Sequence, residues 1–212
     1  MSIEKIILVG GGGHCKSVID VIESEGKYEI AGIIDVKEKI GSDILGYKII
    51  ATDDQLSDLV KQFRNFHITL GHIKSNAVRV KLFNDLKSKG AHFPVIKSPT
   101  AHVSKHTDCG QGTIIMHYAV VNAGTVIGEN CIINSRALIE HDAVIANHVH
   151  ISTGAIINGD CRVCQNVFVG SGSVISNCIC IIDDCIIGAG SVVIKDILKA
   201  GTYVGNPVSI KK

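Results

Sequence analysis

A run of glycines close to the N-terminus has the composition of a phosphate-binding loop. The apolar stretch Ile6–Val9 leads into Gly10–Gly13 and His14, where a helical pattern begins. Glycines between a strand and a helix let backbone amides approach a phosphate at the helix N-terminus. Asp35 follows about twenty residues later, at the spacing of the carboxylate that binds a ribose hydroxyl in nucleotide-binding folds. These residues predict a nucleotide site.

The glycine spacing favours a single nucleotide over a dinucleotide. Gly10 and Gly12 match the dinucleotide pattern G-x-G-x-x-G, but Cys15 stands in place of the third glycine. The α/β half of the chain is also too short for a second mononucleotide-binding half. We therefore expect Gly10, Gly12, Gly13 and His14 to contact one nucleotide-linked substrate. A glycine turn without a ligand is the alternative.

The charge and the hydropathy of the chain exclude several classes of partner. It has 21 Lys and Arg against 20 Asp and Glu, so it has no strong field of one sign for nucleic acid or an anionic membrane. Its apolar runs are all shorter than the about 18 residues of a membrane span, and it begins without a secretory signal. We expect a cytoplasmic protein whose eight cysteines are free thiols.

The first half of the chain alternates strand-like and helix-like segments. Strands are predicted at 5–9, 29–34, 47–50, 67–70 and 92–96, and helices at 14–25, at 75–89 and from an N-cap at Thr52 through Val60. Such alternation is typical of a mostly parallel sheet with helices on its faces. We expect a small Rossmann-like domain over residues 1–98, which would bind the nucleotide.

The second half follows a period of six residues. Fifteen of the sixteen residues at this spacing are Ile or Val: Val103, Cys109, Ile115, Val121, Ile127, Ile133, Ile139, Ile145, Ile151, Ile157, Val163, Val169, Ile175, Ile181, Ile187 and Val193. Four places further on in each hexad the residues are nearly all small. An unbroken repeat of this length predicts a parallel β-helix over residues 99–212.

Three hexads complete one triangular coil, so residues at equivalent places in successive coils are expected to stack. The hexads make about five coils, roughly 24 Å of stack at the spacing of a sheet. His141 then has Gly159 one coil above it and Ala123 one coil below it. Both neighbours are small, which predicts a space beside the imidazole that the backbone of Gly159 would line.

The second half resembles a known fold. The run from Ile127-Gly128 to Ile187-Gly188-Ala189-Gly190-Ser191, followed by Gly205-Asn206-Pro207, is similar to the left-handed β-helix of the bacterial hexapeptide-repeat acyltransferases. The handedness of the predicted β-helix comes from this resemblance.

Further motifs resemble those of one family of sugar acyltransferases, the sialic acid O-acetyltransferase family, whose relatives include UDP-4-amino-sugar N-acetyltransferases of bacterial glycan pathways. The residues that carry the resemblance are Gly10–His14, Asp35, Gly71 with Asn76 and Arg79, and Glu140–Asp142. It implies an acetyl-CoA-dependent homotrimer that acetylates the amine of a UDP-4-amino-4,6-dideoxy sugar in surface glycan biosynthesis.

The resemblance also implies roles for individual residues. His141 matches the general base of the family and Asp142 the acidic neighbour that orients it. The space beside Gly159 would then receive the thioester carbonyl, and His150 matches a second histidine that contacts acetyl-CoA. Acetyl-CoA is the expected co-substrate, and no metal is expected.

Three alternatives remain open at this stage. The same motifs would suit an O-acetyltransferase of sialic acid or a related nonulosonic acid, or a β-helical scaffold that binds a nucleotide-sugar without turning it over. A zinc site is the third, because β-helical carbonic anhydrases bind zinc through histidines. Their pair is spaced H-x-x-x-x-H, which neither His102 with His106 nor His148 with His150 reproduces, and Cys161-x-x-Cys164 lacks a second such pair.

Overall fold

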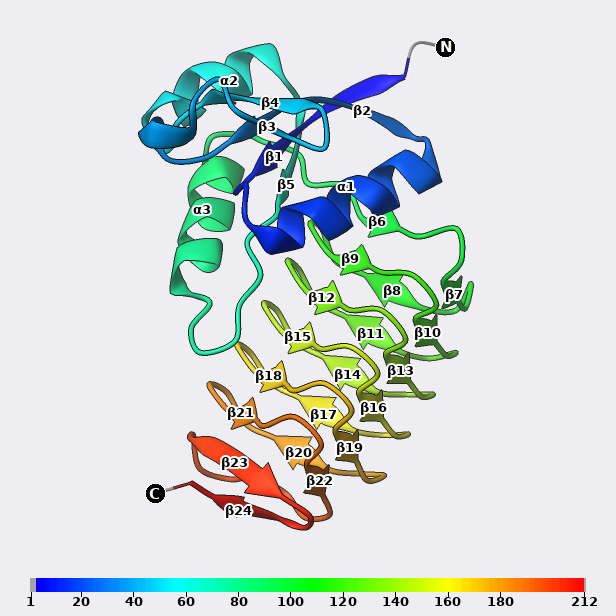
Figure 1. The fold of residues 1–212 in the computed structure, drawn as a ribbon. Coiled ribbons are helices and arrows are strands. Elements are labelled where there is room, and N and C mark those ends of the chain that lie inside the picture. The colour runs from blue at the N-terminus through cyan, green and yellow to red at the C-terminus, as the bar shows by residue number, and fades with distance from the viewer. Residues whose placement is uncertain (1–2, 212) are drawn as a thin grey trace.

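The computed structural model describes residues 3–211, which form an N-terminal α/β domain and a C-terminal parallel β-helix (Figure 1). The α/β domain has a five-stranded sheet in the order β3-β4-β2-β1-β5. Its strands are β1 (Glu4–Val9), β2 (Tyr28–Ile34), β3 (Asp43–Ile44), β4 (Tyr47–Ala51) and β5 (Asn65–Ile68). All neighbouring strands are parallel except β3 and β4, which form a hairpin that the sequence did not predict.

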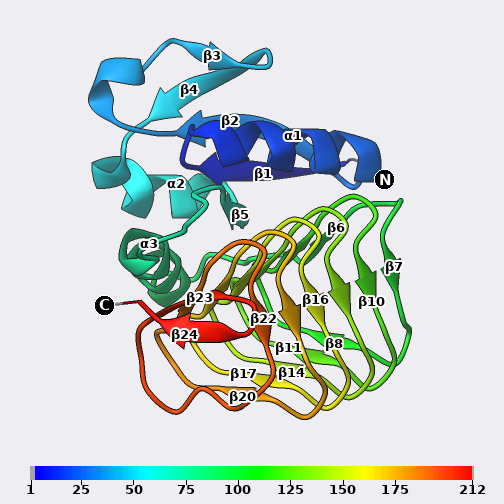
Figure 2. The ribbon, with the colours of Figure 1, turned by 60° about the horizontal axis from the view of Figure 1, so that its bottom comes forward.

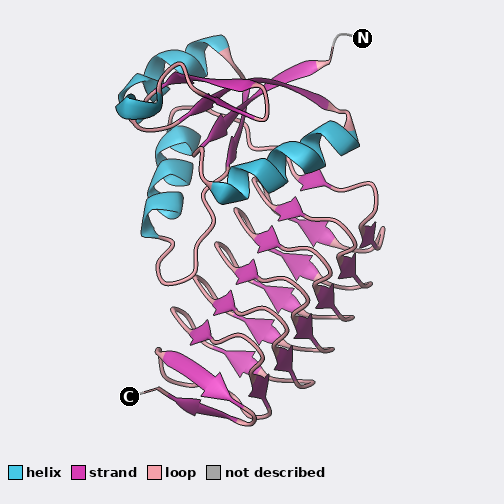
Figure 3. Cartoon of the chain, in the orientation of Figure 1, coloured by secondary structure: helices cyan, strands magenta, loops and turns pink. Residues whose placement is uncertain are grey.

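Helices cover both faces of this sheet (Figure 3). They are α1 (Gly13–Glu25), α2 (Leu56–Gln62) and α3 (Ala77–Ser88), with short 3-10 turns at Lys37–Lys39 and Asp53–Gln55. Ile6 and Leu8 of β1 pack with α1, whereas Ile7 and Val9 pack on the other face with α2 and α3. Successive side chains of a strand point to opposite faces, so the unbroken apolar run Ile6–Val9 in β1 is what a strand covered on both sides requires.

The β-helix consists of three sheets that meet at tight corners, and their strands pair in parallel except for the C-terminal hairpin β23–β24 (Figures 1 and 2). The β7 face contains β7 (His102–Val103), β10 (Val120–Val121), β13 (Leu138–Ile139), β16 (Ile156–Ile157), β19 (Val174–Ile175) and β22 (Val192–Val193). The β8 face contains β8 (Asp108–Cys109), β11 (Val126–Ile127), β14 (Val144–Ile145), β17 (Arg162–Val163) and β20 (Cys180–Ile181). The β9 face contains β6 (Ile96–Lys97), β9 (Ile114–Ile115), β12 (Ile132–Ile133), β15 (His150–Ile151), β18 (Phe168–Val169), β21 (Ile186–Ile187), β23 (Thr202–Gly205) and β24 (Val208–Ile210).

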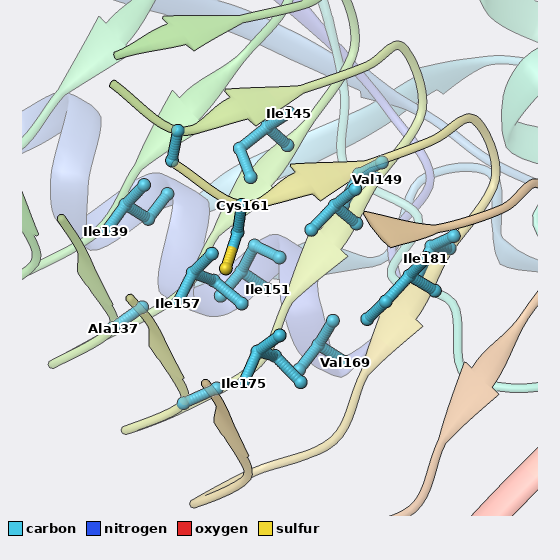
Figure 4. Close-up of a cluster of buried hydrophobic side chains, with 14 of the residues drawn as sticks. Ala137, Ile139, Ile145, Val149, Ile151, Ile157, Cys161, Val169, Ile175 and Ile181 are labelled. Carbon is cyan, nitrogen blue, oxygen red and sulfur yellow. The ribbon is translucent and has the colours of Figure 1, made fainter. Parts of the chain in front are cut away.

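The strand register confirms the predicted coil of three hexads. Val121 pairs with Ile139 and Ile139 with Ile157, so each partner lies three hexads further along the chain. The Ile and Val of the hexads fill the interior of the β-helix, and small residues such as Ala137 and Cys161 are buried at its corners (Figure 4). All eight cysteines are free thiols.

One predicted strand is wrong in its position. Residues 92–96 do not form a strand of the α/β sheet, where His92 makes only an isolated bridge to Asn65. Instead the Ile96 amide donates to the carbonyl of Thr113, and the strand Ile96–Lys97 pairs with β9. The β-helix therefore begins before residue 98, inside the range that we expected to belong to the N-terminal domain.

The α/β domain packs on the β9 face of the β-helix (Figure 2). The outward side chains of Ile114 and Ile132 are fully buried in one cluster with α1. No part of residues 3–211 covers the β7 face in this way, and its outward side chains Val120, Leu138 and Ile156 remain half-buried. None of the helices within residues 3–211 is both long and apolar enough to cross a membrane.

Candidate active site

His141 and Asp142 occupy the corner that connects β13 to β14. The Nδ1 of His141 lies 2.8 Å from Oδ2 of Asp142, and both side chains are exposed, at 57% and 60%. Asp142 has a φ of 58°, in the left-handed region that the corner requires. A carboxylate can only accept, so Nδ1 donates to it and Nε2 is left as the proton acceptor.

Glycines in the neighbouring coils make room for both side chains. A Cβ at Gly124 would lie 2.3 Å from Oδ1 of Asp142, and one at Gly159 would lie 2.8 Å from Nε2 of His141. The carboxylate of Asp142 thus lies against the backbone of Gly124 in the coil below, and the imidazole of His141 lies against the backbone of Gly159 in the coil above. The space that we expected beside Gly159 is occupied by the imidazole itself, because the ring leans onto the coil above.

Acidic groups around the imidazole favour its protonated form. The hydrogen bond that Nδ1 of His141 donates to Asp142 is the largest cause that raises the pKa of His141, and the charges of Asp142, Asp160 and Glu140 act in the same direction. Glu140 itself accepts a hydrogen bond from Nδ2 of Asn122, one coil below. The pair therefore has the geometry and the electrostatics of a base that takes up a proton on Nε2.

A second feature is a cavity of about 720 Å³ at the carboxyl ends of β1 and β5. The strand order places the switch point of the sheet between these two strands, which is where ligands bind in such folds. The cavity is lined by Gly12, Gly13, His14, the segment Thr69–Ser75 and His150. The first turn of α1 directs its free amides into the cavity, as an anion-binding helix N-terminus does.

The glycines of the loop have distinct reasons to be glycine. Gly10 has a φ of 109°, and a Cβ there would lie 2.5 Å from Cδ2 of Leu70. A Cβ at Gly11 would lie 2.5 Å from Oδ2 of Asp35. Around Gly12 and Gly13 there is open space, so these two leave the backbone accessible from the cavity.

Asp35 supports the glycine loop. Its Oδ2 accepts from the Gly11 amide at 2.9 Å and from Nζ of Lys39 at 2.8 Å, and its Oδ1 accepts from the Val36 amide. Burial opposes the ionised form, but the hydrogen bonds from Lys39, Val36 and Gly11 outweigh it and lower the pKa of Asp35. Asp35 also lines an adjoining groove with Thr52 and Gln55, beside the glycine loop.

Three imidazoles form one wall of the glycine-loop cavity. Nδ1 of His150 donates to the carbonyl of His72 at 2.9 Å, and the two rings meet edge to face. Neither nitrogen of His72 nor Nε2 of His14 has a hydrogen-bond partner among the described residues. Burial is the main cause that lowers the pKa values, to about 3 for His14 and His72 and to about 4 for His150, so all three rings are neutral at pH 7.

The predicted site residues fall into two groups that one chain does not bring together. His141, Asp142 and Gly159 are at the corner between the β7 and β8 faces, whereas His150 shares the cavity with Gly12, Gly13 and His14. That corner lies on the side of the β-helix away from the α/β domain (Figure 2). A substrate held at the glycine loop is out of reach of His141 in the same chain.

Sequence reasoning missed three residues of these sites. Gly11 and Gly124 admit the carboxylates of Asp35 and Asp142, and Gly124 was detectable because it stands one coil before Asp142. His72 had no such signal, since its neighbour His150 belongs to the other half of the chain. Within residues 3–211 no three His, Cys, Asp or Glu side chains are close enough to hold a metal ion.

Two family models match the chain, one in each half. Residues 5–86 match the PglD N-terminal domain, and residues 106–141 match the bacterial transferase hexapeptide of six repeats. The first match covers the glycine loop and Asp35, and the second ends at His141. Together the two matches support the hexapeptide-repeat acyltransferase family for this chain. Among curated proteins, none matches the sequence itself.

Solved structures of this family match over the whole chain. The acetyltransferase domain of PglB from Neisseria gonorrhoeae is 29% identical, with a TM-score of 0.91 over 98% of this chain and 100% of its own. A histidine variant of perosamine N-acetyltransferase from Caulobacter crescentus, in complex with CoA and GDP-perosamine, is 28% identical, with a TM-score of 0.92 over 100% of this chain and 98% of its own. WeeI from Acinetobacter baumannii, 22% identical, shares the fold with a TM-score of 0.86 over 98% of this chain and 100% of its own. The hexapeptide-repeat chain described here is likewise an enzyme of the acetyltransferase class.

Proposed function

We propose that the protein transfers the acetyl group of acetyl-CoA to the amine of a nucleotide-linked amino sugar, of the UDP-4-amino-4,6-dideoxy type, in surface glycan biosynthesis. His141 is the general base and Asp142 its orienting partner. The PglB domain is known in complex with acetyl coenzyme A, and the perosamine N-acetyltransferase in complex with CoA and GDP-perosamine. Because acetyl-CoA is consumed, we assign the enzyme to the cytoplasm.

The observation that carries the proposal is the state of the His141 imidazole. Its Nδ1 donates a hydrogen bond to Asp142, and its Nε2 has no hydrogen-bond partner among residues 3–211. The sugar amine attacks the thioester carbonyl carbon and forms the C–N bond, while Nε2 takes the proton from the amine nitrogen. The C–S bond then breaks, and the proton passes to the CoA thiolate. The products are the N-acetyl sugar and free CoA.

Gly159 and His150 are proposed as contacts of acetyl-CoA. The amide of Gly159 has no acceptor among residues 3–211 and lies beside the imidazole of His141, where it can donate to the developing oxyanion. His150 keeps Nε2 as an acceptor, with only a 3.4 Å contact to Nδ2 of Asn134, and lies at the opposite site. It would reach the acetyl group only if another subunit brought its His141 corner to this cavity.

The nucleotide sugar is proposed to bind in the glycine-loop cavity. The diphosphate lies at the amides of Gly12 and Gly13, and the nucleoside extends into the groove beside Asp35, which is lined also by Thr52 and Gln55. Asp35 would then hold a ribose hydroxyl as well as the Gly11 amide. The sugar is left facing His14 and the histidine wall.

A homotrimer would complete the active site, since one chain separates its two halves. A continuous row of aliphatic side chains runs along the outside of the β7 face, next to the His141 corner: Val120, Leu138, Ile156, Val174 and Val192. Nothing within residues 3–211 covers this aliphatic row, and contiguous apolar patches of this kind mark interfaces. We propose that it packs against a second copy and brings the His141 corner to the glycine-loop cavity of that copy.

The deciding experiment measures thiol release from acetyl-CoA with UDP-, dTDP- and GDP-linked 4-amino sugars, with sialic acid and without an acceptor. Release with one amino sugar, reduced by a factor of about 10²–10⁴ in His141→Ala, supports the proposal. Release with sialic acid alone would assign O-acetylation instead. Binding of a nucleotide sugar with no release for any acceptor would leave a non-catalytic scaffold.

A further inference from the structure

Arg79 is a buried cation without an anionic partner. It lies on α3, its side chain is 1% exposed, and no carboxylate of residues 3–211 is within 4.0 Å of it. Nη1 donates to the carbonyls of Ile68 at 2.6 Å and Leu70 at 2.8 Å, while Nε and Nη2 both lie 3.4 Å from the carbonyl of Asn130. Three neutral acceptors hold the group without cancelling its charge.

These contacts connect the substrate loop to the β-helix. Ile68 ends β5 and Leu70 lines the glycine-loop cavity, whereas Asn130 belongs to the corner that leads into β12 of the β9 face. Leu70 in turn lies directly against Gly10, where a Cβ would clash with its side chain. Arg79 therefore fixes the wall of the cavity from behind, without lining it.

The charge of Arg79 persists at neutral pH. Burial lowers the pKa of its guanidinium to about 10, which still leaves the group protonated. After burial, its charge is a further cause that lowers the pKa values of the neighbouring histidines His14, His67, His72, His148 and His150. The polar wall of the cavity thus consists of neutral imidazoles with one buried positive charge behind them.

We infer that Arg79 is a positioning residue whose uncompensated charge, acting through the cavity wall, attracts the diphosphate of the substrate. An anion in the cavity would supply the partner that the buried guanidinium lacks. It would also accept hydrogen bonds from the buried imidazoles of His14 and His72, whose ring nitrogens are unpartnered among the described residues. The inference rests on the proposed nucleotide-sugar site, but not on acetyl transfer.

The test compares a charged ligand with its uncharged parent. Affinities are measured for UDP and GDP by calorimetry, and for uridine and guanosine by ligand-detected NMR, on wild type and Arg79→Met. We expect the Kd of the diphosphate to rise about tenfold or more, because a charge is lost in a site of low dielectric. The Kd of the nucleoside should change less than about twofold, since it carries no charge for Arg79 to attract.

Two further variants separate charge from structure. Lys87→Met removes a cation from the same helix. Nζ of Lys87 lies 2.6 Å from Oε2 of Glu129, and neither residue lines the cavity, so this variant should leave both affinities unchanged. Arg79→Lys keeps the charge but loses the fork to three carbonyls, so its melting temperature should fall while the ratio of the two affinities stays that of wild type. It decides the question if Arg79→Met does not fold.

The outcomes distinguish failure of the inference from failure of the proposed function. If wild type binds neither diphosphate, the nucleotide-sugar site is wrong and the inference falls with it. If wild type binds one of them and Arg79→Met weakens nucleoside and diphosphate equally, Arg79 is a structural clamp only. A ratio that falls equally in Arg79→Lys and Arg79→Met would also overturn the electrostatic role.

Discussion

The contact between His141 and Asp142 depends on the corner that holds them. Adjacent side chains of a strand point to opposite faces, so two neighbours in a strand could not form this bond. At the corner, the φ of 58° at Asp142 turns its side chain back toward the imidazole. A dyad of sequential residues is thus possible at a β-helix corner, and glycines in the adjacent coils leave it room.

Replacing Asp142 by Asn should move the pH profile of the enzyme. In wild type the hydrogen bond that His141 donates to Asp142 raises the pKa of His141 above its usual 6.5, so the activity falls as the pH drops through that raised value. The variant lowers the pKa of His141 again, and the acidic limb of kcat/KM should shift to lower pH, with a maximum reduced about tenfold or more. An acidic limb that stays in place would assign it to another group.

Gly159→Val should disable the base without unfolding the protein. A Cβ at this position would lie 2.8 Å from the tip of the imidazole, which is exposed and free to swing away. We expect kcat to fall while the free energy of unfolding changes by less than about 0.5 kcal/mol, because the three atoms nearest to the new Cβ on buried Gly159 all belong to this movable ring. Asn177→Val, at the equivalent but exposed position one coil further, is the control. Full turnover with normal acetyl-CoA affinity in Gly159→Val would remove Gly159 from the site.

At the scale of the element, strand β16 contains two isoleucines with opposite environments. Ile157 is fully buried in the interior, whereas Ile156 belongs to the half-buried aliphatic row of the β7 face. Ile157→Ala should lower the free energy of unfolding by about 2–5 kcal/mol, because it leaves a cavity in a packed core. Ile156→Ala should cost much less in the isolated fold. Chemical denaturation of both variants checks the difference, and equal losses would contradict the assigned faces.

The elements differ in how far the sequence determined them. The hexads predicted the coils from residue 103 to residue 193, since each six-residue unit repeats the same arrangement and a misplaced strand would break the register on all three faces. The strand expected at 92–96 was wrong because its apolar residues suit either sheet, and only the contact of Ile96 with Thr113 decides between them. The two-residue strand Asp43–Ile44 is too short for a periodicity to show.

The predictable parts of the site are those whose contacts join residues that are adjacent in the sequence or separated by a fixed spacing. His141 with Asp142, and the glycine loop with Asp35, follow from adjacency or from a known spacing. The histidine wall does not, because His72 and His150 meet only after the β5–α3 loop descends along the β9 face. Contacts between the two halves of the chain have no counterpart in either half alone.

At the scale of the whole molecule, the two halves of the site imply catalysis between subunits. Leu138→Glu places a charge in the middle of the aliphatic row, one residue from buried Ile139. We expect sedimentation velocity to show the proposed trimer for wild type and a monomer for the variant, with the activity lost and the fold kept. An active monomer would contradict the shared site.

Mixing two inactive variants tests the same point directly. His141→Ala lacks the base, and Gly12→Glu blocks the cavity where the diphosphate is proposed to bind. If neighbouring subunits share each site, mixed trimers contain some sites built from two intact halves, and part of the activity should return. If the subunits exchange but no activity returns, both halves of each active site belong to one chain.

Because the coils are regular, the length of the β-helix is a whole number of equal steps. Each coil of three hexads returns the chain to the same corner, so inserting or deleting one whole coil leaves every face assignment unchanged. Only the separation between the α/β domain and the C-terminal hairpin β23–β24 would change, in steps of about 4.8 Å. A change in length by whole coils therefore keeps the stack intact, whereas an insertion of any other length has to leave the stack as a loop.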